Sequence, residues 1–162
     1  MTDTTALPVR PASFDELTAL IGEELGPTDW HDVTQERVNA FADATGDHQW
    51  IHIDTERAAA SPLGGTIAHG LYSLSLGPAL SATLLRFDGF AHSLNYGYNK
   101  VRFPAPVPVG SRIRMRATIQ SAEQVGGGIQ VTMSQVVERE GSDKPVVVSE
   151  SVARVVEAGQ QP

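Results

Sequence analysis

The sequence contains no cysteine among its 162 residues, and only 6% of them are aromatic. The absence of cysteine excludes disulfide bonds, zinc sites built on thiolates and a cysteine nucleophile. No apolar run approaches the roughly 20 residues that a membrane-spanning helix needs. Because Met1–Pro11 has neither a charged n-region nor an apolar h-region, we expect a cytoplasmic protein that is not secreted.

Positive charge is also scarce, since 12 Lys and Arg stand against 19 Asp and Glu and give a net charge of −7. Five of the basic residues fall between residues 100 and 116, where there is no acid. They are Lys100, Arg102, Arg112, Arg114 and Arg116. A chain with one basic stripe on an acidic background is poorly suited to nucleic acid. It could hold a small polyanionic ligand locally, or the stripe could be a solvated strand face.

The hydrophobic share of the chain, 41%, is enough to bury one core, so we expect one folded domain. We place an N-terminal segment with a helix at residues 1–27, the domain at 28–157 and a flexible tail at 158–162. The run from Ser13 to Glu16 has the form of a capping box, and Gly26-Pro27 ends the helix that follows.

Further helix signals precede the middle of the chain. Thr34 is a candidate N-cap for a helix that ends near Gly46, and Asp54 for a short helix over 55–60. Residues 68–85 are apolar or small on nearly every side, which predicts a helix buried all round, bent at Pro78.

Four strand-like runs fill the C-terminal half, at residues 93–103, 111–123, 129–140 and 145–156. Their hairpin-length connections predict an antiparallel sheet, and the triple glycine at 126–128 is then a turn and not a phosphate loop. Long strands curled around one apolar helix describe an α+β hot-dog fold; the alternative is an open α+β sandwich. Because such a sheet leaves an edge uncovered, we expect a homodimer with a continuous sheet.

The densest polar segment runs from residue 46 to 54 and contains two imidazoles and two carboxylates. It could be a surface loop whose polar side chains cap helices. It could be a metal site on His48 and His52, with Asp47 and Asp54 nearby. It could also be an acid–base pair of Asp47 and His52.

The metal interpretation requires helical geometry through residue 50. Gly46 and the strand-like run Trp50–Ile53 argue against a helix there. We therefore expect no metal site.

Gly70 supplies the feature that decides among these interpretations. It opens the central helix, so its amide is among the unpaired N–H groups of the first turn and suits a developing oxyanion. Together with Asp47 and His52 it provides the three parts that water addition to a conjugated thioester needs: a base, an acid and a donor to the enolate oxygen.

Several segments resemble the MaoC-like, (R)-specific enoyl-CoA hydratase (hydratase 2) family, especially its actinobacterial single hot-dog members. They are Phe41–Asp47, Ile51–Asp54, Ile67–Gly70 and Asn95–Ser111. The resemblance spans about residues 30–156. It implies a homodimeric hot-dog enzyme that hydrates trans-2-enoyl-CoA to (R)-3-hydroxyacyl-CoA without metal or cofactor.

The family's catalytic Asp and His fall on Asp47 and His52, and its oxyanion-hole amide falls on Gly70. One departure is that Gln49-Trp50 stands where the family usually has Asn-Pro. Gln49 can still donate and accept, whereas the larger Trp50 could reshape the acyl pocket.

The remaining candidates concern substrate binding. Lys100 or Arg102 is expected to meet the nucleotide end of coenzyme A, with the arginine row at 112–116 solvated. His69 either contacts substrate or steadies the loop before Gly70. We expect Trp30 and Phe103 in the core.

Other residues are expected to have structural roles only. We assign surface or capping positions to His31, His48 and His92, and packing positions to the polar residues of the central helix. Three activities remain open on this fold: a thioesterase, a non-catalytic acyl-CoA-binding module and a dehydratase that acts on carrier-protein thioesters. Acyl chain length and pathway are also left open.

Overall fold

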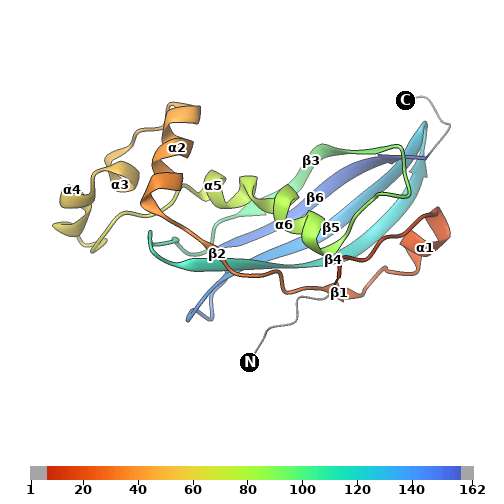
Figure 1. Ribbon diagram of the computed structural model, residues 1–162, viewed down its shortest axis with the longest axis horizontal. Coiled ribbons are helices and arrows are strands. Elements are labelled where there is room, and N and C mark those ends of the chain that lie inside the picture. The colour runs from red at the N-terminus through yellow and green to blue at the C-terminus, as the bar shows by residue number, and fades with distance from the viewer. Residues whose placement is uncertain (1–6, 158–162) are drawn as a thin grey trace.

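A long antiparallel sheet curls around two consecutive helices in the computed structural model, which describes residues 7–157 (Figure 1). The expected tail at 158–162 lies outside the described residues, and the division of the chain at residue 27 stays a prediction. The elements in chain order are α1 Phe14–Thr18, β1 Glu24–Leu25, β2 His31–Asp32, α2 Gln35–Thr45, α3 Trp50–Ile53, α4 Thr55–Ala59, α5 Gly70–Ser75, α6 Gly77–Leu84, β3 His92–Arg102, β4 Arg112–Val125, β5 Gly128–Arg139 and β6 Val147–Val156.

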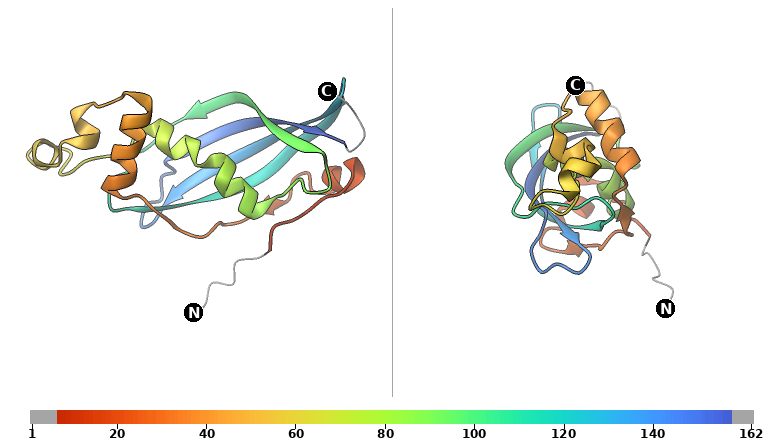
Figure 2. Two further views of the ribbon diagram at one scale, coloured as in Figure 1. Left: turned by 45° about the horizontal axis from the view of Figure 1, so that its top comes forward. Right: turned by 90° about the vertical axis from the view of Figure 1, so that its left-hand side faces the viewer.

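The sheet has the strand order β1-β4-β5-β6-β3, and β2 pairs with the far end of β4. All of these pairings are antiparallel. The glycine turn joins β4 to β5 as predicted. β3 lies at the edge, beyond β6, and the strands wrap around α5 and α6 in both views of Figure 2. The hot-dog prediction is confirmed.

The alternation of β4 sets the inner and outer faces of the sheet. Ile113, Met115 and Ile119 are fully buried under the helices, whereas the arginines between them point outward. Because one face of β4 is apolar and the other is charged, its register is fixed: a shift by one residue would exchange the two faces.

The N-terminal helix is shorter than predicted. Its capping box forms, with Ser13 Oγ accepting from the amide of Glu16 at 3.2 Å. The helix nevertheless ends at Thr18, because the chain then turns at Gly22 with φ +87° and pairs with the sheet through β1. Strand pairing with β4 thus overrides the helical spacing of the later residues.

The central segment forms two helices and not one bent helix. α5 ends at Ser75, and α6 begins with Pro78 in its first turn, where a missing amide hydrogen is tolerated. The expectation of burial on every side is wrong for the single chain: Leu71 is 61% exposed, and Pro78 and Ala82 are exposed as well. The sheet covers only one side of the helices.

Two expected core aromatics are also less buried than predicted. Phe103 is 43% exposed, just beyond the end of the edge strand β3. Trp30 is half-buried on the outer face of the sheet, with the guanidinium of Arg114 4.3 Å from its ring centroid. A cation against its face stabilises Trp30 there.

A helical cap formed by α2, α3 and α4 lies at one end of the molecule (Figures 1 and 2). Thr34 and Asp54 cap α2 and α4 as predicted. Within the described residues, no helix has both the length and the apolar character needed to cross a membrane.

Candidate active site

The loop after α2, the short helix α3 and the segment that leads into α5 meet beside the helical cap. Residues 50–53 form α3, so the expectation of an extended run there is wrong. Two contacts hold the turn in helical form against the local alternation: the amide of Ile67 donates to Ile51, and Arg57 lies 4.3 Å above the Trp50 ring. Tertiary contacts thus decide the conformation.

The structure brings Asp47, His52 and His69 together. A carboxylate oxygen of Asp47 and one ring nitrogen of each histidine lie within 4.8 Å of one another. Asp47 has a 56% exposed side chain, whereas both imidazoles are buried. The cluster is therefore open to solvent on the carboxylate side and closed on the imidazole side.

His52 is held as a neutral base. Its Nδ1 lies 2.6 Å from the carbonyl oxygen of Ile67. Because a carbonyl only accepts, Nδ1 carries the hydrogen and Nε2 bears a lone pair. Burial lowers the pKa of His52 below its ordinary value of 6.5, and the neighbouring His69 also lowers it, against the raising effects of the Ile67 carbonyl and Asp47. At neutral pH the ring can accept a proton.

His69 connects the two members of the predicted pair. Its Nε2 donates to the main-chain oxygen of Asp47 at 3.0 Å, and its ring stacks on His52 with centroids 3.7 Å apart. By residue type and spacing, Asp47, His52 and His69 could hold a metal ion. The hydrogen on His69 Nε2 points at the Asp47 carbonyl, however, so this nitrogen would have to give up that bond to act as a ligand.

Gly70 begins α5 with an open amide. Among the described residues, no group accepts a hydrogen bond from this amide or from the next two amides of the first turn. The Phe103 ring lies against the glycine, since a Cβ at this position would meet ring atoms at 2.9 Å. Any side chain at position 70 would therefore clash with the Phe103 ring, so this position requires glycine.

Gln35 is a site residue that the sequence reasoning missed. Its Nε2 donates to the carbonyl oxygen of His52 at 2.7 Å and to Asn39 at 2.8 Å, and its Oε1 accepts from Thr66 at 2.5 Å. One side chain thus ties the start of α2 to α3 and to the segment before His69. Its only signal in the sequence is its place directly after the N-cap Thr34.

Comparisons with known proteins identify the family of the chain. The sequence profile of the MaoC like domain matches residues 16–141. The chain belongs to this family. It is 54% identical over 145 residues to 3-hydroxyacyl-thioester dehydratase Z of Mycobacterium tuberculosis strain H37Rv, covering 89% of this chain and 96% of the relative.

Two further MaoC-like comparisons extend the match. Nodulation protein N of Rhizobium leguminosarum bv. viciae is 43% identical over 145 residues, which cover 85% of this chain and 87% of the relative. The unliganded R-hydratase PhaJ1 from Pseudomonas aeruginosa superimposes with a TM-score of 0.72 at 26% identity, covering 89% of this chain and 85% of that one. The predicted family and fold are confirmed.

The other histidines and candidate residues near the cluster of this MaoC-like chain differ in their surroundings. His48 is exposed and binds Asp43 at 2.8 Å, so it shares no site with His52. Gln49 is exposed, and Trp50 is half-buried beneath Arg57. His31, expected at a surface or capping position, is half-buried, and its Nε2 binds the hydroxyl of Tyr72 at 2.9 Å.

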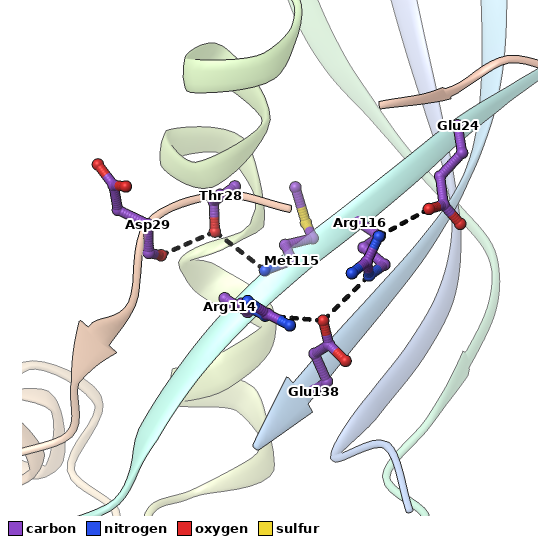
Figure 3. A network of polar contacts seen from close by, with 7 residues as sticks. All are labelled: Glu24, Thr28, Asp29, Arg114, Met115, Arg116 and Glu138. Carbon is purple, nitrogen blue, oxygen red and sulfur yellow. Dashed lines mark hydrogen bonds and ion pairs between the residues drawn. The ribbon is translucent and has the colours of Figure 1, made fainter. Parts of the chain in front are cut away.

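Lys100 and Arg102 lie exposed on the edge strand β3. The other three residues of the basic stripe lie on the outer face of the sheet and are paired with acids, and Figure 3 shows two of them. Arg114 and Arg116 both bind Glu138, at 2.8 and 3.1 Å. Arg116 also binds Glu24 at 2.7 Å. The row at 112–116 lies on a solvent-facing strand surface as expected, but acids far away in the sequence neutralise it.

A cavity of about 640 Å³ opens between α6 and the strands β3, β5 and β6. Its lining is mainly apolar, with Phe87, Met133 and Val152 among the contributors. Gln135 forms a polar spot in the wall, where its Nε2 donates to Ser81 at 2.9 Å.

Proposed function

We propose that this protein is a hydro-lyase that adds water reversibly to trans-2-enoyl thioesters and forms (R)-3-hydroxyacyl thioesters, without metal or cofactor. The observation that carries the proposal is the cluster of Asp47, His52 and His69, because His69 directly precedes Gly70, whose open amide begins α5. The dehydratase and R-hydratase names of the relatives support the same reaction class.

The first step positions a water molecule between Asp47 and His52. Polar atoms no more than 4.8 Å apart can both contact one water at about 2.6–3.2 Å. The neutral His52 takes a proton from this water through Nε2 while the water oxygen bonds to the β-carbon. Asp47 accepts a hydrogen bond from the other hydrogen, which stays on the new hydroxyl group, and so fixes the direction of attack.

The second step forms an enolate and then protonates it at the α-carbon. The alkene electrons move onto the thioester oxygen, and the Gly70 amide donates to this enolate oxygen, which stabilises the transition state. As the enolate collapses, the pair returns a proton to the α-carbon. Because both groups approach from one face of the alkene, the addition is syn and gives one product configuration.

Substrate binding follows from the same placement. The thioester lies at Gly70, and the acyl chain follows α5 and α6 toward the cavity. Gln49 and Trp50 flank the entrance, and Lys100 or Arg102 meets the phosphates of coenzyme A. A carrier-protein thioester has the same reacting atoms. A cytoplasmic location stays a prediction.

The edge strand β3 is our proposed dimer contact. Leu94 and Tyr96 on β3 are 55% and 66% exposed, and Leu71 and Phe103 are exposed as well. An exposed edge with large apolar side chains favours pairing with a second copy. A monomeric mass in solution at micromolar concentration would contradict this assembly.

The decisive experiment compares crotonyl-CoA hydration by Asp47→Asn, His52→Gln and the wild type. We expect kcat to fall by roughly 10²–10⁴ in both variants while thermal unfolding is unchanged. Asp43→Asn is the matched control, because Asp43 is an exposed carboxylate at the end of α2 that binds only His48 among the described residues. Its kcat stays at the wild-type value.

Three outcomes overturn the proposal. Near wild-type hydration in both variants removes the assignment of the pair. Release of free coenzyme A, seen with a thiol reagent, indicates a thioesterase. Binding of crotonyl-CoA by the wild type without turnover indicates a binding module. Chiral analysis of the product tests the (R) configuration.

A further inference from the structure

His69 touches both members of the proposed acid–base pair, although it lies at the start of the central helix and away from them in sequence. It is 4% exposed, donates to the Asp47 main chain and stacks on the His52 ring. Phe41 packs on it at a ring-centroid distance of 5.0 Å and fixes the imidazole in place.

We propose that His69 is a positioning residue that holds the Asp47 loop and the His52 ring in register for catalysis. The inference rests on the proposed hydration reaction, and it assigns to His69 no contact with the reacting atoms.

The contact with Asp47 anchors the loop between α2 and α3 to the start of α5. Within the described residues, Asp47 makes only two other hydrogen bonds, and both are local: its amide donates to Thr45 at 3.5 Å, and its carboxylate accepts from Gln49 at 3.4 Å. The bond from His69 Nε2 is the one that ties this loop to the central helix. Without it, only the weak local bonds to Thr45 and Gln49 hold the carboxylate near His52.

The contact with His52 restricts the second member of the pair. The Ile67 carbonyl fixes one edge of the His52 ring, and the stacked His69 ring covers one face. The ring is thus held at an edge and on a face, which keeps its Nε2 lone pair in one direction. The neighbouring imidazole also opposes protonation of His52, in the same sense as burial.

His69 is poorly placed to exchange protons itself. Its Nε2 hydrogen is used on the Asp47 carbonyl, and Nε2 lies 3.9 Å from the Asp47 carboxylate. Its Nδ1 is buried and has no hydrogen-bond partner among the described residues. The residue therefore acts through its neighbours.

The experiment tests the hydrogen-bond donor of His69 and its aromatic ring with two different variants. His69→Phe keeps a ring against His52 and loses the donor, whereas His69→Gln keeps a donor near the Nε2 position and loses the ring. We expect His69→Phe to lower kcat about 10- to 100-fold with little change in KM, because misplacement of about 1 Å costs up to that much. His69→Gln recovers part of the loss.

Two readouts distinguish positioning from a structural role. The acid limb of the kcat/KM profile moves to higher pH in both variants, since the imidazole that opposes His52 protonation is gone. In a His52→Gln background, His69→Gln lowers kcat no further, because the pair through which it acts is already broken. His48→Gln, an exposed histidine next to Asp47 in sequence, leaves all of these measurements unchanged.

The inference is overturned if both variants keep kcat within about twofold of the wild type. It is also overturned if kcat falls while the acid limb stays in place, or if the losses add in the His52→Gln background. These outcomes differ from failure of the proposed function, in which the wild type does not hydrate crotonyl-CoA or Asp47→Asn and His52→Gln keep full activity.

Discussion

Two polar clusters of this molecule use similar residue types for different ends. On the outer face of β4 and β5, Arg114 and Arg116 share Glu138, and Arg116 binds Glu24 as well (Figure 3). At the helical cap, the Asp47 carboxylate lies 3.9 Å from Nε2 of His69 and, among the described residues, pairs with no Lys or Arg. One cluster satisfies its charges internally, and the other does not.

The difference shows which polar groups await a ligand. Paired charges on a sheet face complete one another and add little binding capacity. At the helical cap, a buried imidazole and a half-exposed carboxylate lie close together, and the residue after the neighbouring His69 begins α5 with an open amide. Unsatisfied groups that meet at one place are the stronger indication of function.

The pH profile is the largest effect that can sharpen this comparison. The proposed reaction needs neutral His52, and burial lowers the pKa of that ring. The group therefore stays in its active form from neutral pH down to below 6.5, and kcat/KM falls only as the pH drops through the lowered value, by about tenfold per unit. The groups that face the ring are Asp47 and His69.

Stopped-flow or steady-state measurement of crotonyl-CoA hydration between pH 4.5 and 8 gives this profile. The acid limb is defined when the measured range extends about one pH unit to each side of it. An acid limb above 6.5 would mean that the pKa of His52 is raised and not lowered. This result would contradict the difference between the two clusters. Glu138→Gln is the control variant, because the outer face takes no part in the reaction and its profile matches the wild type.

Much of this arrangement was readable from the sequence where local chemistry decides. The alternation of β4 predicted its buried face, and Thr34 and Asp54 predicted two helix starts. Asp47 and His52 could be named because they lie five positions apart in a segment that joins two helices. Each of these signals depends on neighbours within a few positions.

The rest depends on contacts between distant segments. Residues 50–53 alternate like a strand, yet the contact of Ile51 with Ile67 forms α3. The arginine row looked free because Glu138 lies more than 20 residues away along the chain and meets it only across the sheet. Gln35 gave no signal of its own, since a glutamine in the first turn of a helix is commonplace.

The salt dependence of KM tests the role of Lys100, a cation that neither polar cluster pairs with an acid. Lys100 is exposed on β3 and has no ion-pair partner among the described residues. If it meets the phosphates of coenzyme A, Lys100→Ala raises KM for crotonyl-CoA about two- to fivefold at low salt, and the difference disappears at about 0.5 M salt because the charges are screened. kcat is unchanged.

Lys144→Ala is the matched control, because Lys144 is an exposed lysine on the turn between β5 and β6. A KM of the wild type that does not respond to salt would remove the nucleotide contact from Lys100. An equal rise in both variants would indicate general attraction of the anionic substrate and no local contact.

Substitutions on the outer face of the sheet should have the smallest effects on activity and stability. Glu138→Gln removes the charge that Arg114 and Arg116 share, while Arg116 keeps Glu24. The three side chains are partly exposed, so we expect the free energy of unfolding to fall by about 0.2–1 kcal/mol, and by less at high salt. Urea unfolding with and without added salt measures this change.

Glu24→Gln is the control for that experiment, because it leaves both arginines in contact with Glu138 and should lower stability less. The kinetic constants stay at wild-type values in both variants. A lower KM for crotonyl-CoA in Glu138→Gln would show that the released arginines bind the nucleotide, and the sheet face would then belong to the substrate surface. Unchanged KM with slightly reduced stability leaves the arginine row as a self-neutralised part of the fold.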